Sequence, residues 1–216
     1  IVAQGEEHAR IRFTSVPGAA FVPNRHGGRP GLPDGPPRWE GIHLVDSMSE
    51  ENVLAFADIE YAQDSQGSIG VNASSLLVDH VTFHGTHLRM VYGVNASLVV
   101  QHSTFPDVFG PDEDPVAIGL DNVAEPIKIT GRTPAGGQLR IAYNSFGTNK
   151  GHNDVIDADS RRVGDGPILQ IIGNVFQGAG DELLDLGGDV YVAGNLFQNV
   201  TKDEFTSDRG YASAIS

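Results

Sequence analysis

The chain has 216 residues, with 28 acidic and 14 basic side chains and a formal net charge of −14. This charge argues against a nucleic-acid partner, because proteins that bind a phosphate backbone carry basic patches. The absence of cysteine excludes disulfides, thiolate nucleophiles and cysteine-based zinc sites, and no apolar run approaches the roughly 18 residues that suggest a membrane span.

The first elements read as strands separated by turns, which the 27 Gly and 12 Pro of the chain favour. The strand-like sequence IRFTS (11–15) is followed by a proline-rich segment, 16–38, that we expect to leave the sheet as a lateral loop. The sequence 47–62 has a capping-box match at Ser47 and Glu50, which would start a helix. Its alternating apolar residues from Val53 to Ile59 favour a strand instead.

An internal repeat organises the rest of the chain. Five segments superpose without gaps and end in a common Phe, whose successive steps are 22, 41, 30 and 21 residues. They are LLVDHVTF (76–83), LVVQHSTF (98–105), LRIAYNSF (139–146), LQIIGNVF (169–176) and VYVAGNLF (190–197). A unit of about 22 residues with insertions is typical of proteins built from stacked repeats.

A second column of the repeat lies upstream of each segment. Its polar members, each preceded by Val, Leu or Ile, are Asn72, Asn95, Asp121, Asp157 and Asp185. The sequence GVNAS occurs in it twice, at 70–74 and 93–97. Two short strands per repeat describe a chain that winds into coils and stacks on itself.

The phrases WEGIHLVDS (39–47), NVLAFADIEYA (52–62) and GDELLDL (180–186), with the repeat, resemble the pectate-lyase-like superfamily, including its NosD-type and carbohydrate-active members. The resemblance covers roughly residues 10–205 and implies an all-β fold, a right-handed parallel β-helix. We expect one solenoid domain over 1–216, a central slice of a longer protein, with lateral loops at 16–38 and 106–126. The resemblance implies that such loops form the walls of a substrate groove.

Stacked coils predict two internal ladders, because like positions of neighbouring coils lie about 4.8 Å apart. The Phe column should form an aromatic stack. Asn144, Asn174 and Asn195 each stand two residues before their Phe, where an Asn can bond turn backbone and adopt a left-handed conformation.

The acidic residues of the last two coils are the first candidate site. Matching Asp157 with Asp185 places Asn153 over Asp181 and Asp154 over Glu182. Carboxylates so close need a shared proton or a cation. The candidate catalytic residues are Asp154, Asp157, Asp181 and Asp185. The candidate ligands of a Ca²⁺ cofactor are Asp154, Asp157, Asp181, Glu182 and Asp185. Hydrogen-bonded structural ladders are the alternative.

Basic residues near this cluster are candidates for substrate binding. They are Lys150, His152, Arg161 and Arg162. The resemblance implies a lyase chemistry in which Ca²⁺ neutralises the carboxylate of a uronate while an Arg or Lys removes the C5 proton of the sugar. The chain has no recognisable lyase motif, and it lacks the Gly-His-Gly and Arg-x-Lys of polygalacturonases.

Histidines form a second candidate. His80 and His102 share one column position, so they should stack, and neutral imidazoles at that spacing are possible transition-metal ligands. Duplication of one motif would produce the same pair without any metal.

These observations favour an extracellular module that binds polysaccharide, as a non-catalytic accessory or adhesin-like segment. A polysaccharide lyase or glycoside hydrolase that uses the stacked Asp residues is the alternative. Either reading predicts a secreted, cell-surface or periplasmic protein with flanking domains in a larger parent chain.

Overall fold

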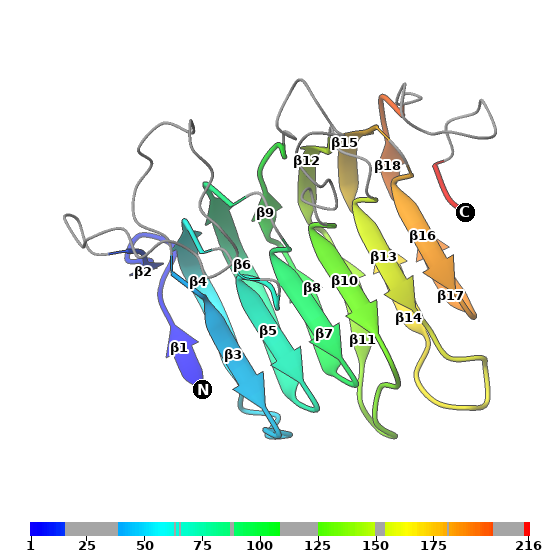
Figure 1. Cartoon of the computed structure of the whole chain (residues 1–216), viewed down its shortest axis with the longest axis horizontal. Coiled ribbons are helices and arrows are strands. Elements are labelled where there is room, and N and C mark those ends of the chain that lie inside the picture. The colour runs from blue at the N-terminus through cyan, green and yellow to red at the C-terminus, as the bar shows by residue number, and fades with distance from the viewer. Residues whose placement is uncertain are drawn as a thin grey trace, which may run out of the picture.

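The computed structural model describes residues 1–15, 39–62, 64, 66–86, 89–108, 125–149, 154–180, 182–200 and 214–216. Within these residues the regular elements are β-strands, and all pairings between named strands are parallel (Figure 1). This part of the chain has no helix with the length and apolar character needed to cross a membrane.

The strands are short, apart from two long ones in the N-terminal half. They are β1 (Val2–Gln4), β2 (Ile11–Phe13), β3 (Ile42–Val45), β4 (Val53–Glu60), β5 (Ile69–Asn72), β6 (Ser75–His84), β7 (Val91–Val94), β8 (Ser97–Gln101), β9 (Thr104–Phe105), β10 (Ile127–Thr130), β11 (Leu139–Ala142), β12 (Ser145–Asn149), β13 (Ile156–Asp159), β14 (Leu169–Ile172), β15 (Val175–Ala179), β16 (Leu184–Gly187), β17 (Val190–Ala193) and β18 (Leu196–Phe197).

The strands form two sheets. The six-stranded sheet has the order β16-β13-β10-β7-β5-β3, and these strands lie side by side in Figure 1. The twelve-stranded sheet contains two ladders that share the long strands β4 and β6. One continues through β8, β11, β14 and β17, and the other through β9, β12, β15 and β18. After β6 the chain visits the six-stranded sheet, the first ladder and the second ladder in turn.

The strand register confirms the repeat found in the sequence. Leu76, Leu98 and Leu139 are direct partners, followed by Leu169 and Val190. The segment with two readings is strand β4, and not a helix. Its Ile59 stands opposite Phe83, so Ile59 occupies the Phe column.

The second predicted column is wrong in its register between Asn72 and Asn95. Val71 pairs with Gly93 and Asn72 with Val94, a step of 22 residues, whereas the two GVNAS copies are 23 residues apart. A step of 23 would bring Tyr92 opposite the buried Ile69 and turn Val91 outward, because strand side chains alternate between faces. Burial of Val91 therefore overrides the identity of the pentapeptides.

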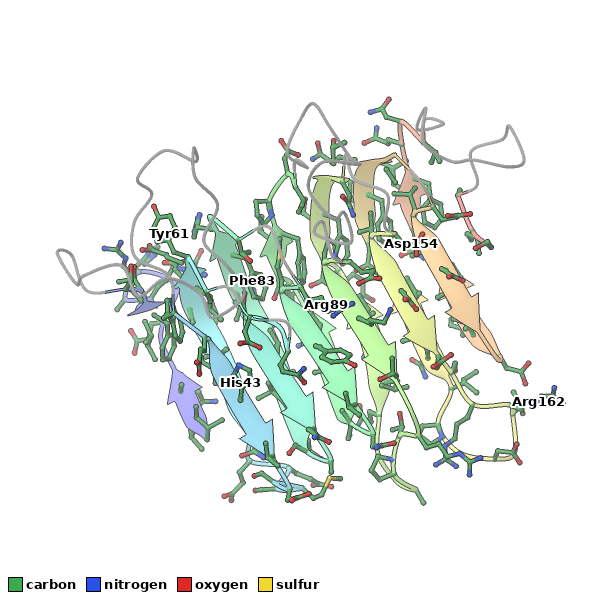
Figure 2. All side chains as sticks on the ribbon, viewed as in Figure 1. His43, Tyr61, Phe83, Arg89, Asp154 and Arg162 are labelled. Carbon is green, nitrogen blue, oxygen red and sulfur yellow. The ribbon has the colours of Figure 1, made fainter. Side chains whose placement is uncertain are left out.

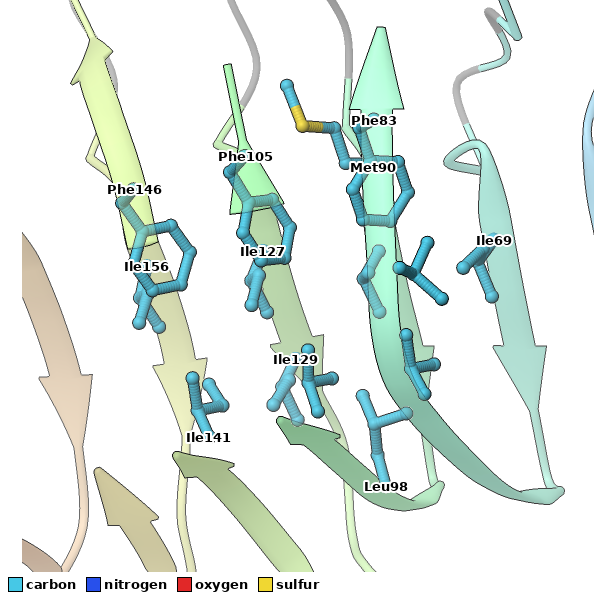
Figure 3. Close-up of a cluster of buried hydrophobic side chains, with 14 of the residues drawn as sticks. Ile69, Phe83, Met90, Leu98, Phe105, Ile127, Ile129, Ile141, Phe146 and Ile156 are labelled. Atoms are coloured by element: carbon cyan, nitrogen blue, oxygen red, sulfur yellow. The ribbon is translucent and has the colours of Figure 1, made fainter. Parts of the chain in front are cut away.

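A stack of Phe rings runs through the core, as the sequence predicts. Phe83, Phe105, Phe146 and Phe176 are buried, and Phe197 continues the stack. Neighbouring ring centroids are 4.5 to 5.2 Å apart. Figure 3 shows Phe83, Phe105 and Phe146 in line, beside buried aliphatic side chains. Each such pair contributes about 0.5–1.5 kcal/mol beyond the burial of its apolar area.

The predicted Asn ladder is also present. The Oδ1 of Asn174 accepts hydrogen bonds from the backbone N and the Nδ2 of Asn144 at 2.9 and 3.0 Å. Asn195 does the same for Asn174 at 2.8 and 3.0 Å. The left-handed residue at this corner is the one before the Asn, namely Tyr143, Gly173 or Gly194. The Asn satisfies turn backbone groups without adopting that conformation itself.

The predicted lateral loops fall mostly outside the described residues, which exclude 16–38 and 109–124. At the two ends of the second predicted loop, Val108 forms a parallel bridge with Asn149 and Glu125 is buried.

We expect Phe146→Ala to lower the free energy of unfolding by about 3–5 kcal/mol, because it opens a cavity between two stacked rings. Tyr191→Ala removes a ring that is 54% exposed on β17 and should change stability by less than about 0.5 kcal/mol. Urea unfolding of both variants measures this. Equal effects of the two substitutions would contradict a stabilising role of the Phe stack.

Asn174→Asp is expected to cost about 3–5 kcal/mol at neutral pH, because it places an unpaired charge against buried acceptors. The Nδ2 that it removes donates to Ile141 O at 2.9 Å and to Asn195 Oδ1 at 3.0 Å. The loss should shrink at acid pH, where a protonated carboxyl donates again. Asn72→Asp, at an exposed position, is the matched control in the same urea unfolding series. A loss that is independent of pH would argue against the ladder as its cause.

Candidate functional site

One face of the six-stranded sheet carries a row of polar side chains. Lys128 lies between the buried Ile127 and Ile129 of β10, so strand alternation turns it outward. Its register partners on the neighbouring strands are Tyr92 and Asp157, and Asp157 in turn pairs with Asp185. The predicted match of Asp157 with Asp185 is therefore present.

A second row precedes these strands. Its members stand two residues before the first residue of β7, β10, β13 and β16, and they are Arg89, Glu125, Asp154 and Glu182. Figure 2 shows Arg89 and Asp154 toward the same end of the six-stranded sheet. We call the two rows together the polar strip: Arg89, Tyr92, Glu125, Lys128, Asp154, Asp157, Glu182 and Asp185.

Ion pairs connect the two rows. The Nζ of Lys128 contacts Asp157 Oδ2 and lies 3.3 Å from Glu125 Oε1. The Nε of Arg89 lies 3.0 Å from Glu125 Oε2, and its guanidinium lies 5.2 Å from the ring centroid of Tyr92. The Glu125 side chain is only 8% exposed. Two cations therefore hold a nearly buried carboxylate, which fixes the side chains at the centre of the strip.

The carboxyl of Asp185, at the β16 end of the polar strip, is less fully compensated. Partial burial, and then the charges of Asp157 and Glu182, raise the pKa of Asp185, while Lys128 and a hydrogen bond with Ser216 only partly oppose this. Burial alone would lower the pKa of Lys128, but its hydrogen bond with Asp157 and the charges of Glu125 and Asp157 outweigh burial and raise it. Asp157 thus lies between the Lys128 ammonium and the Asp185 carboxyl, whose pKa is raised.

The other residues predicted for this site have different places. Arg161 and Arg162 follow β13 on a turn at the opposite end of the strand from Asp154 (Figure 2). There Arg161 Nη1 donates to Asp165 O at 2.6 Å. The structure does not bring these two arginines to the polar strip. Lys150, His152 and Asp181 lie outside the described residues.

Sequence reasoning missed four residues of the strip, namely Arg89, Tyr92, Glu125 and Lys128. The sequence PIKIT (126–130) carries a signal for Lys128, because its apolar residues alternate around a single Lys. Asp121 was assigned to this column instead, and Lys128 is the residue that pairs with Tyr92 and Asp157.

A second polar cluster lies on the twelve-stranded sheet. His80 and His102 stack as predicted, with ring centroids 4.8 Å apart, and Asp79 contacts both rings. Among the described residues these three form the group of metal-binding side chains whose ligand atoms all lie within 4.8 Å of one another. Calcium at the acidic end of the polar strip stays a prediction.

Comparison of the chain with models of protein families, with curated protein sequences and with solved structures finds no match.

We expect Asp185→Asn to raise the free energy of unfolding at neutral pH. Because the folded state raises the pKa of Asp185 above the ordinary 3.8, the folded chain binds this proton more readily than the unfolded chain. The ionised group therefore costs stability above the raised pKa, and the cost disappears as the pH falls below 3.8. Urea unfolding across this range measures the effect.

Asp46→Asn is the control for this experiment, since Asp46 is exposed and does not belong to the polar strip. Its effect should stay within about 0.5 kcal/mol at every pH. A loss of stability in Asp185→Asn at neutral pH would contradict the electrostatic origin of the pKa shift.

Proposed function

We propose that the chain is a right-handed parallel β-helix of the pectate-lyase-like kind and that it binds polysaccharide along the polar strip. The observation that carries the proposal is the in-register row Tyr92, Lys128, Asp157 and Asp185, anchored by the ion pairs of Glu125. The cyclic order of the three strand ladders supports the β-helix. We further propose a secreted, cell-surface or periplasmic protein with flanking domains.

The spacing of the strip suits a linear glycan. Each strand adds one side chain to a row at a rise of about 4.8 Å, which is comparable to the length of one pyranose ring. Charged groups held by ion pairs offer donors and acceptors to hydroxyls without much loss of side-chain freedom on binding. The Tyr92 ring adds an amphipathic surface of the kind that sugar faces contact.

The charge of the strip favours a neutral glycan. It carries five carboxylates, Glu125, Asp154, Asp157, Glu182 and Asp185, against the two cations Arg89 and Lys128. A polyuronate would meet repulsion there unless Ca²⁺ bridged the carboxylates. We therefore propose a neutral polysaccharide as the ligand, and calcium as a requirement for acidic ones alone.

One observation favours glycoside hydrolysis as a second candidate. Asp185 has a raised pKa and neighbours Asp157, which Lys128 contacts, and carboxyls in such different environments suit a general acid and a base. A lyase is less well supported, because the raised pKa of Lys128 makes it a poor base at neutral pH.

Affinity electrophoresis of the full chain in gels containing neutral and uronate polysaccharides tests binding. We expect at least one neutral glycan to retard the chain, and we expect Tyr92→Ala and Lys128→Met to weaken retardation by at least about tenfold, as loss of a central contact does. Tyr191→Ala, which removes an exposed ring of β17, is the matched control. Retardation by no glycan, or equal retardation of all variants, overturns the proposal.

The same panel separates binding from hydrolysis. A hydrolase releases new reducing ends, and Asp185→Asn should abolish that release while retardation persists. Repeating the electrophoresis with EDTA tests the role of calcium. Uronate binding that survives EDTA would refute the bridging role of Ca²⁺.

A further inference from the structure

The three residues Asp79, His80 and His102 gather at a corner of the repeat, away from the polar strip. β6 bends there, since its first half pairs with β8 and Thr82 pairs with β9. His80 and His102 occupy the corner itself, with left-handed φ values of 52° and 49°. Their side chains are 42% and 41% exposed, so solvent and small solutes reach them.

Stacking fixes the two imidazole planes. Phe56 lies against His80 with ring centroids 4.5 Å apart and an interplanar angle of 14°. On the other side Tyr143 lies against His102 at 5.5 Å and 8°. A side chain held between rings on both sides loses little further freedom when it binds a ligand, which is what a preorganised site requires.

The ring nitrogens converge on one oxygen atom. Nδ1 of His80 lies 2.9 Å from Asp79 Oδ1, and Nδ1 of His102 lies 3.0 Å from the same atom. With metal–ligand bonds of about 2.1 Å, ligand atoms about 3.0 Å apart subtend roughly 90° at an ion. An ion that displaces the protons shared with Asp79 would therefore meet the carboxylate oxygen and either ring nitrogen at an ordinary angle, and all three ligand atoms lie within 4.8 Å of one another.

We propose that Asp79, His80 and His102 form a surface site for a divalent transition-metal ion, with two imidazole nitrogens and one carboxylate oxygen as ligands and the remaining positions open to water. Two nitrogens and one oxygen suit Cu²⁺, Ni²⁺ and Zn²⁺, with Cu²⁺ the tightest. Ca²⁺ and Mg²⁺ prefer sites made of oxygen alone.

The fold does not require this combination. The register positions equivalent to Asp79 in the other repeats are Ala55, Gln101, Ala142, Ile172 and Ala193. Duplication of a repeat explains why two histidines stack, but it does not explain an acid at the one place where both ring nitrogens reach it. Asp79 is thus the residue that distinguishes a ligand set from a duplicated turn.

Titration of the full chain with Cu²⁺, followed by calorimetry and by electron paramagnetic resonance, tests the proposal. His102→Phe keeps an aromatic ring between His80 and Tyr143 but removes a ligand, and Asp79→Asn removes the anionic oxygen. We expect each to weaken Cu²⁺ binding by at least about tenfold. His43→Phe, at an exposed position of β3, should bind as the unmodified chain does, and excess Ca²⁺ should not compete.

The resonance spectrum keeps the test decisive if a variant does not fold. The unmodified chain should show two imidazole nitrogens bound to copper. A spectrum without imidazole nitrogen, the absence of saturable Cu²⁺ binding, or unchanged affinity in folded His102→Phe would each overturn the site. None of these outcomes bears on glycan binding, because the corner and the polar strip lie on different sheets.

Discussion

Parallel pairing with a fixed register places each residue of one repeat directly over its counterpart in the next. The backbone hydrogen bonds hold these counterparts about 4.8 Å apart, so a column of like residues repeats one kind of contact from strand to strand. A side chain is therefore favourable in a column when it interacts well with a copy of itself. Phenylalanine stacks on phenylalanine, and asparagine both donates and accepts, so its ladder from Asn144 to Asn195 leaves no amide without a partner.

Carboxylates fail this condition, and the row of the polar strip on the strands mixes residue types instead of repeating one. Lys128 stands where its neighbours have Tyr92 and Asp157, and its ammonium lies between Glu125 and Asp157. One strand further on, Asp185 repeats the acid of Asp157, and partial burial together with the charges of Asp157 and Glu182 raises its pKa. At the corner near Asp79, two imidazoles stack on each other, and the single carboxylate of Asp79 contacts both of them.

The sequence reveals the columns that are self-complementary better than those that are not. The Phe column and the Asn ladder could be predicted because identical residues recur at the step of the repeat. The identical GVNAS copies suggested a register one residue too long, because turn residues resemble one another for local reasons while Ile69 and Val91 set the pairing. Lys128 was missed because a residue that departs from its column leaves no repeated signal. Arg161 is close to Asp157 in sequence, yet the remainder of β13 separates them.

The difference between residues that match their column and residues that depart from it also indicates where functional residues lie in such a molecule. A residue that matches its column is already explained by stability, so its presence says little about a ligand. A residue that breaks its column forgoes a self-complementary contact and needs another reason to be there. Lys128 between Tyr92 and Asp157, and Asp79 among Ala, Gln and Ile, are two such breaks, and each contacts the polar side chains around it. The polar strip, proposed to bind glycan, and the corner of Asp79, His80 and His102, proposed to bind a metal ion, each contain one such residue, and they share no contacts.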